Sequence, residues 1–392
     1  MVAGILLGGG TGHGFPGDAA LQLAAIPFLF CCVKQLAADG LTGVSRAEVF
    51  LLAAIAFVPV MQIIPLPPAI WTGFPGADIR LAAFRLTGEA PDWRSISLSP
   101  EATALGALAL LPPFAVFLGA RMLNFTRRRL LVLVVLCVAG MSVFLGFAQV
   151  AGGPESPLRF YAFTNTDDAV GFFANRNHFA ASLYVAMLLA APWALDGVMG
   201  FLGGRGDSRR AAANLIVCFV SATLMFLLGV SQIIARSRAG VALTLVAAIC
   251  IAMLVLTDPR NRWRRASMAL FGAAMTLVVL FAAQSGVSRF VDRLTFDPRT
   301  DTRVIVANHT IAAAWSFLPF GSGIGSFRDI YATRETPLDL YPYVYINAAH
   351  DDWLQIALEA GLPGLFVLVA FVVWLCRGGR DSWPEGVRRK ID

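Results

Sequence analysis

The chain has 392 residues, of which 57% are hydrophobic and only 14% are charged. Soluble proteins carry about 25% charged residues, and here the apolar residues form repeated blocks long enough to cross the ~30 Å hydrocarbon core of a bilayer. With a mean hydropathy of +0.69, this composition excludes a water-soluble domain. It predicts an all-α, polytopic integral membrane protein, in which the net charge of +6 reports topology rather than nucleic-acid binding.

Nine apolar blocks predict spanning helices, and the short apolar start of the chain raises the expected number to nine or ten. Two helix starts carry local signals: Ser45 and Glu48 fit a capping box, and Ser99 precedes a proline at the first helical position. The predicted spans are Asp18–Leu36, Arg46–Ile64, Glu101–Ala120, Leu130–Val150, Val170–Leu195, Ala211–Ile234, Gly240–Leu256, Ala266–Ala283 and Gly361–Cys376.

Basic residues occupy alternate connections between these blocks. Short loops rich in Lys and Arg stay in the cytoplasm, so the remaining connections, at 65–100, 151–169, 235–239 and 285–360, are expected on the outer face, and the C-terminus inside. All four histidines then lie outside or at outer helix ends. The basic positions are Lys34, Arg46, Arg127–Arg129, Arg205, Arg209, Arg210, Arg260, Arg262, Arg264, Arg265, Arg377, Arg380 and Arg388–Lys390.

Three arginines are expected at the outer face. Arg236 and Arg238 flank a tight turn between two spans, and Arg303 opens a helical run over 304–317. A guanidinium presents a planar fork that matches phosphate oxygens, which favours a clamp for a phosphorylated group. The alternatives are snorkelling to lipid headgroups for the first pair, and for Arg303 an ion pair with Asp297 or Asp301.

His350 is the candidate base in the long outer loop. Imidazole titrates near neutral pH and can take a proton from an attacking hydroxyl, while Asp351 or Asp352 could orient the ring or contact the acceptor. These two aspartates could equally cap the helical run that follows, which we expect to stop at Gly361. A metal held with Asp167 and Asp168 is the less favoured alternative, because the chain has no Asp-x-Asp motif and no paired-histidine spacing.

A second polar group, Asn175, Arg176, Asn177 and His178, begins the span that continues into apolar sequence. Polar side chains at membrane depth are costly unless they have partners, so this run predicts a cavity wall. Capping by Asn175 and Asn177 is a compatible alternative.

These motifs together resemble the O-antigen ligase and polymerase family. The resemblance rests on Ser237–Gly240, on Arg303 with the trailing Gly321-Ser-Gly323-Ile-Gly325, and on His350 with Gly361 and Gly364. The run 171–180 is similar to the form found in many exopolysaccharide polymerases of that family. Asp351 stands where the family usually has asparagine, and only one predicted span follows the loop. The expected organisation is N-terminal helices over 1–170, a ligase-like catalytic region over 171–365 that includes the periplasmic loop 285–360, and the end of the last span with a basic tail over 366–392.

The resemblance implies a GT-C-like glycosyltransferase of the bacterial inner membrane that is inverting, independent of metals and free of cofactors. Its donor would be a glycan on undecaprenyl diphosphate, and its acceptor lipid A–core, a second lipid-linked glycan or a protein hydroxyl. Arg238 and Arg303 would hold the diphosphate, with Arg236 as an addition suggested by its position, and His350 would activate the acceptor. Use of the same chemistry in an O-antigen or exopolysaccharide polymerase is the main alternative, and a flippase or transporter is a more distant one.

Overall fold

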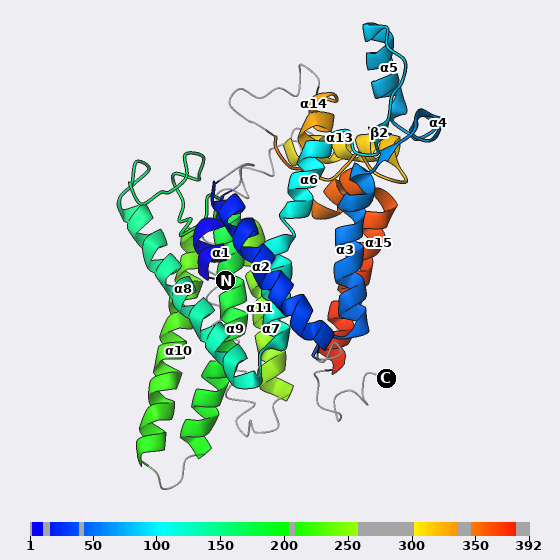
Figure 1. Ribbon diagram of the computed structural model, residues 1–392. Helices are drawn as coiled ribbons and strands as arrows, with labels where there is room; N and C mark the ends of the chain where they lie inside the picture. Colours follow the sequence, from blue (N-terminus) through cyan, green and yellow to red (C-terminus); the bar gives the residue numbers. More distant parts are fainter. Residues whose placement is uncertain are drawn as a thin grey trace. The chain divides into compact units, whose positions relative to one another are not determined.

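The computed structural model describes residues 2–10, 16–38, 43–203, 208–257, 302–335 and 346–381. These parts are almost entirely helical (Figure 1). Their one sheet is a two-stranded antiparallel ribbon in which β1 (Pro65–Leu66) pairs with β2 (Arg94–Ser95), with Pro65 opposite Ser95. The predicted all-α class is confirmed.

Eight helical spans among the described residues are long and apolar enough to cross a membrane. Since eight such helices make the chain polytopic, the predicted membrane fold is confirmed; the ninth predicted span, Ala266–Ala283, lies outside the described residues. The eight are α2 (Pro16–Ala38), α3 (Arg46–Ile63), α6 with α7 (Pro100–Leu108 and Leu111–Met122), α8 (Phe125–Ala151), α9 (Arg176–Gly203), α10 (Ser208–Ile234), α11 (Arg238–Thr257) and α15 (Asp352–Asp381).

Some helix boundaries differ from the prediction. α9 begins at Arg176 rather than at residue 170, because Gly171 adopts φ 55° in a turn. α15 begins at residue 352 and includes a break at Gly361 (φ 60°, ψ −151°), which ends its first segment as predicted. The capping box at the start of α3 is present, with Ser45 N donating to Glu48 Oε2 (2.7 Å) and Glu48 N donating to Ser45 Oγ (3.2 Å).

The chain divides into two compact units. The first comprises Met1–Leu23, Leu123–Val291 and Trp383–Asp392, and the second Ala24–Met122 and Asp292–Ser382. In the first, α8 to α11 pack around a core that includes Val143, Phe179, Leu183 and Leu228, with the six-residue α1 (Val2–Leu7) against α8.

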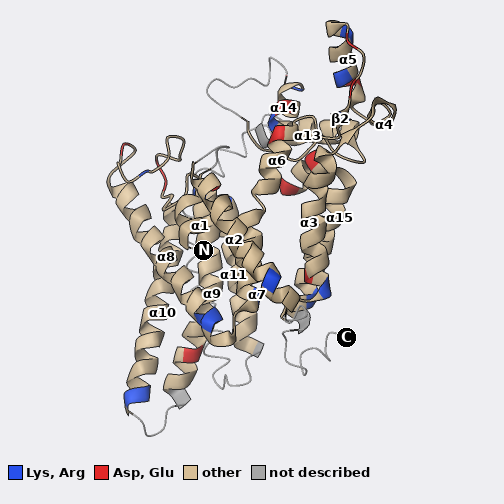
Figure 2. Cartoon of the chain, in the orientation of Figure 1, with Lys and Arg blue, Asp and Glu red and all other residues tan. Residues whose placement is uncertain are grey.

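Antiparallel packing in the first unit brings the start of α8 to the end of α9. Arg129 Nη2 lies 3.9 Å from Asp196 Oδ2, and its guanidinium lies 4.3 Å from the centre of the Trp193 ring. Charged residues of the described helices lie mainly near helix ends (Figure 2). The basic turn at the start of α8 therefore shares an end of the unit with the end of α9, as the alternation of basic connections requires.

In the second unit, α3 packs against α6 and α15, and Phe117 of α7 contacts Trp374 of α15. α13 (Thr302–Phe317) packs against α15 and α14 (Phe327–Ala332) around Val306, Phe317, Phe327 and Leu358. The connection 65–100 carries α4 (Pro68–Trp71) and α5 (Ala77–Thr87) besides the strands. At the start of α3, Arg121 Nε lies 3.1 Å from Glu48 Oε1, which ties the end of α7 to that helix.

Candidate functional site

In the first unit, Ser237 joins two sequence motifs that are 60 residues apart. Its hydroxyl donates to Asn177 Oδ1 (2.8 Å) and accepts from Gly240 N (3.0 Å), so it caps α11 while it is held by the first turn of α9. Ser237 is buried, and the exposed Arg238 is the first residue of the capped helix. Because a helix cap fixes the direction in which the chain enters the helix, this network sets the position of Arg238.

Close helix packing lies directly beneath this cap. Gly240 is buried against α9, and a methyl group at this position would lie 2.5 Å from Ala180 Cβ. The buried Gln232 of α10 donates to Ala180 O (2.9 Å) and to Thr244 Oγ1 (2.7 Å). Helices α9, α10 and α11 are thus tied together at the end where Arg238 lies.

A buried carboxylate organises the neighbouring arginines. Asp168, which is 5% exposed, pairs with Arg176 Nη1 at 2.6 Å and with Arg236 Nη1 at 3.8 Å. Its backbone carbonyl accepts from Arg159 Nη1 (3.0 Å). Arg236 has φ 49° in the turn between α10 and α11. Two guanidinium groups thus pair with the Asp168 carboxylate, and that of Arg159 bonds its backbone carbonyl. The arginines outnumber the carboxylate that they surround, which suits an anionic ligand.

The remaining polar residues at the start of α9 have separate environments. Asn175 Oδ1 accepts from Asn177 N (2.8 Å), so Asn175 caps the helix, whereas the Asn177 side chain reaches Ser237 instead. Arg176 pairs with Asp168, and His178 is exposed. Their use as a cavity wall stays a prediction.

In the second unit, His350 lies two residues before the start of α15, with its side chain exposed and with φ 56°. A non-glycine residue in the left-handed region is uncommon and is found where the surrounding structure holds it. Asp351 Oδ1 accepts from Trp353 N (3.0 Å) and Leu354 N (3.1 Å), so Asp351 caps the first segment of α15. Asp352 is exposed in the first turn.

A chain of hydrogen bonds holds the backbone next to His350. Ala349 N donates to Gln355 Oε1 (3.2 Å), and Gln355 Nε2 donates to Glu359 Oε1 (3.4 Å). Glu359 is 7% exposed and also accepts from Phe327 N, the first residue of α14 (2.9 Å). Gln355 and Glu359 are missing from the residues singled out in the sequence, although their spacing of four on a helix signals contact.

The glycine-rich turn between α13 and α14 is anchored by Gln62 of α3, which is fully buried. Its Nε2 donates to Phe320 O (3.0 Å) and Glu359 O (2.7 Å), and its Oε1 accepts from Ile324 N (3.0 Å). Gly321 and Gly323 have φ 79° and 112°, conformations open to glycine at little cost. The turn and the first segment of α15 therefore form one bonded assembly.

Arg303 is the second residue of α13, and its side chain lies outside the described part of the structure, as do Asp297 and Asp301. In the described ranges, no group of three or more His, Cys, Asp or Glu side chains gathers as a metal site would require. Metal independence stays a prediction.

Comparison with known proteins gives one match. The O-antigen ligase family model matches residues 223–369, a stretch that contains the Ser237–Gly240 turn, α13, His350 and the start of α15. Neither the curated proteins nor the solved structures gave a significant match. The family match supports the resemblance carried by these motifs: residues 223–369 of this multi-pass membrane protein are similar to the O-antigen ligase family, a family of glycosyltransferase-like enzymes.

Proposed function

We propose that the protein moves a glycan from undecaprenyl diphosphate to an acceptor hydroxyl at the periplasmic face of the bacterial inner membrane. The observation that carries the proposal is the anchored turn at Ser237, which presents Arg238 beside the Asp168–Arg236 pair at one end of the first unit. That end is opposite to the one where Arg129 meets Asp196. Basic connections mark the cytoplasmic side, so this arrangement supports a periplasmic position for the turn.

The arginines have a defined task in this chemistry. The acceptor oxygen attacks the anomeric carbon as the bond to the diphosphate oxygen breaks, which inverts the configuration at that carbon. Negative charge develops on the leaving diphosphate, and preorganised cations stabilise it. Arg238 and Arg303 are the proposed diphosphate ligands, with Arg236 as an addition suggested by its position in the turn before Arg238; no metal ion or cofactor is required.

His350 is the proposed general base, which accepts the proton of the acceptor hydroxyl. Its conformation supports this role, because a strained backbone held by neighbouring hydrogen bonds is typical of functional positions. Ala349, the residue before His350, is held by the hydrogen bond that its N–H donates to Gln355 Oε1. Asp351 caps the helix and lies next to the base in sequence, so its proposed contact with the acceptor would use the oxygen not engaged in the cap.

The proposed chemistry serves either a ligase or a polymerase, and these two enzymes differ in the acceptor that they use. A ligase would use lipid A–core, and a polymerase a second lipid-linked glycan. The hydrogen bond that Ser237 Oγ donates to Asn177 Oδ1 favours a polymerase as the second candidate, because it ties the polymerase-like run 171–180 to the proposed diphosphate-binding turn. Asn175, Arg176 and His178 would line the acceptor side, and the catalytic region would extend over 171–365.

The test is transfer by purified protein in membranes of defined lipid composition, with a glycan on undecaprenyl diphosphate as the donor. We expect glycan on lipid A–core when that acceptor is present, detected by mass spectrometry. Longer lipid-linked glycans formed without core would support the polymerase. Passage of the lipid-linked glycan across the bilayer without any transfer product would instead support a flippase and reject the enzyme.

A further inference from the structure

A cavity of about 480 Å³ lies within the second unit, on the connection 65–100 between α3 and α6. This connection precedes the stretch matched by the family model, and none of its residues is among those proposed to bind the diphosphate or to catalyse the transfer. The side chains that give the cavity its character are Arg80, Phe84, Glu89, Trp93, Arg94 and Leu98. Ligand pockets for small molecules typically enclose about 300–1,000 Å³, so one or two sugar rings would fit.

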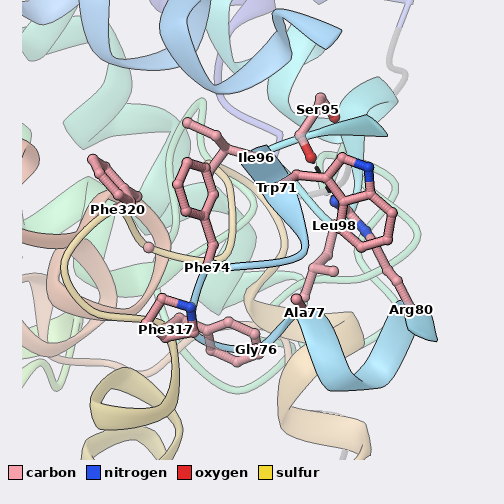
Figure 3. Close-up of a pocket in the computed structure, with 12 residues that line it drawn as sticks. Trp71, Phe74, Gly76, Ala77, Arg80, Ser95, Ile96, Leu98, Phe317 and Phe320 are labelled. Atoms are coloured by element: carbon pink, nitrogen blue, oxygen red, sulfur yellow. Dashed lines mark hydrogen bonds between the residues drawn. The ribbon is translucent and has the colours of Figure 1, made fainter. Parts of the chain in front are cut away.

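The wall of the cavity is preformed. Trp71 is 1% exposed, donates from Nε1 to Asp92 O (2.9 Å) and contacts Phe84. Arg80 donates through its two Nη atoms to the carbonyl oxygens of Ser95 and Ser97. Its guanidinium lies beside the Trp71 ring, as seen in Figure 3, which draws the adjoining pocket that shares Arg80, Ser95 and Leu98 with this cavity. A ligand therefore meets ordered side chains, which lowers the entropic cost of binding.

The charge of the cavity is unbalanced. Two arginines and one carboxylate, Glu89, are among the residues that line it. Burial and the nearby charge of Arg94 lower the pKa of Arg80 to about 10, so Arg80 remains cationic at neutral pH. The Arg94 guanidinium lies 5.3 Å from the centre of the Phe84 ring, which holds it at the cavity. Two neighbouring cations favour a ligand with negative charge.

An aromatic surface lies beside these cations. Trp93 lines the cavity and is 58% exposed, and Phe84 and Leu98 add further apolar wall. A phosphate group alone would use the guanidinium groups and leave this wall uncovered. A sugar ring presents C–H groups on its faces and hydroxyl groups at its edge, so it can use both the aromatic wall and the donors of the arginines.

We propose that this cavity is a second glycan-binding site, which takes an acidic saccharide unit of a substrate through Arg94 and Trp93. The identification of the ligand as part of a substrate glycan rests on the proposed function. The site would hold the glycan chain away from the bond that reacts, and so contribute to the choice of glycan.

The experiment measures binding rather than turnover. Full-length protein in detergent micelles is titrated with a short oligoglucuronate, with a malto-oligosaccharide of equal length as the neutral probe, and contacts are detected by saturation-transfer NMR. The variants are Arg94→Gln and Trp93→Ala, both at exposed positions. Arg85→Gln is the matched control, since Arg85 is exposed on α5, in the same connection 65–100, and is not among the residues that line the cavity.

We expect saturable binding of the acidic probe, weakened at least tenfold (~1.4 kcal/mol) by either cavity variant and unchanged by Arg85→Gln. Equal affinity for the neutral probe, or no effect of Arg94→Gln, would overturn the proposal. A different outcome is that the wild-type protein binds no saccharide but retains phosphatidylglycerol in nanodiscs, and that the cavity variants lose this lipid. That outcome would assign the cavity to a lipid headgroup and would also overturn the proposal. If the wild-type protein binds the acidic probe but shows no transfer activity, the proposed function is rejected and the saccharide site remains.

Discussion

Gly240→Ala is expected to destabilise the first unit and to lower transfer activity. The new methyl group would lie 2.5 Å from Ala180 Cβ and 3.0 Å from the Cβ and Oγ of Ser237. Carbon atoms in contact prefer a separation of about 3.5–4.0 Å, so roughly 1 Å of extra space is needed. Ala180 has no rotamer that yields this space, and α11 must move away from α9.

The size of the effect follows from two opposing contributions. Overpacking of a close contact typically costs about 1–3 kcal/mol, and replacement of a helical glycine by alanine returns up to about 1 kcal/mol. With the full return, the net loss lies between about 0 and 2 kcal/mol. The 2.5 Å approach to a β-carbon that cannot rotate away places it in the upper half of that range, at about 1–2 kcal/mol. Because the movement displaces the capped turn at Ser237, it displaces Arg238 as well, and transfer activity should fall at least about tenfold.

Gly229→Ala is the matched control in the neighbouring helix α10. A methyl group there would lie 3.9 Å from Met187 Cε, an ordinary van der Waals contact, so stability should rise by up to about 1 kcal/mol and activity should remain. Thermal unfolding in detergent micelles and the transfer assay measure both variants. Wild-type stability and activity for Gly240→Ala, or shifts of the same sign for both variants, would refute the reasoning.

Four further predictions concern the proposed reaction. His350→Ala should abolish transfer while the protein still inserts into membranes, as followed by fractionation; retained turnover would remove His350 from the mechanism. Arg238→Lys should reduce activity at least about tenfold although the charge remains, because an ammonium cannot bind two phosphate oxygens in the manner of a guanidinium, and normal activity would contradict the fork argument. Gln355→Met should lower kcat with little change in KM, since it removes the bond to Ala349 N, and a change in KM alone would assign Gln355 to binding. A chelator should leave the transfer rate unchanged, and inhibition that added divalent ions reverse would favour a metal site.

The sequence predicts the membrane fold well because span length and hydropathy are local properties. The capping box at Ser45 is equally local, and it is confirmed. The start of α9 is missed because 169–173 is an apolar run that continues the helical pattern. What ends the pattern is Gln149 of α8, which accepts from Gly171 N (2.9 Å) and donates to Gly171 O (2.8 Å). Such a contact across 22 positions leaves no trace in local periodicity.

In the candidate site, too, the sequence predicts features that depend on local chemistry and misses those that depend on contacts between distant segments. Motif residues such as Arg238 and His350 could be singled out from their chemistry and their polar surroundings. The supports Gln62 and Glu359 could not, because they are polar residues within largely apolar helices and Gln62 has its partners far along the chain. Gln62 and Glu359 are 297 positions apart. From the sequence, Asp168 is a candidate only for the less favoured metal site, whereas in the structure it pairs with Arg176 and Arg236.

Two buried glutamines indicate how these supports could be recognised in advance. Gln62 and Gln149 lie within the last three residues of α3 and α8, helix ends that the basic connections assign to the outer face. Gln232 has the same place in α10 but bonds two neighbouring helices, through Ala180 O and Thr244 Oγ1. An amide within a membrane helix is costly unless it is hydrogen-bonded, and it offers both a donor and an acceptor. A turn in a neighbouring segment supplies both kinds of partner, since its N–H and C=O groups are not used by a helix. Gln149 bonds both groups of Gly171, and Gln62 bonds Phe320 O and Ile324 N. A lone glutamine near the end of an apolar span is therefore a physical reason to expect a polar partner in a neighbouring segment. For Gln149 and Gln62 that partner is irregular backbone, which leads to the start of α9 and to the turn that anchors α15.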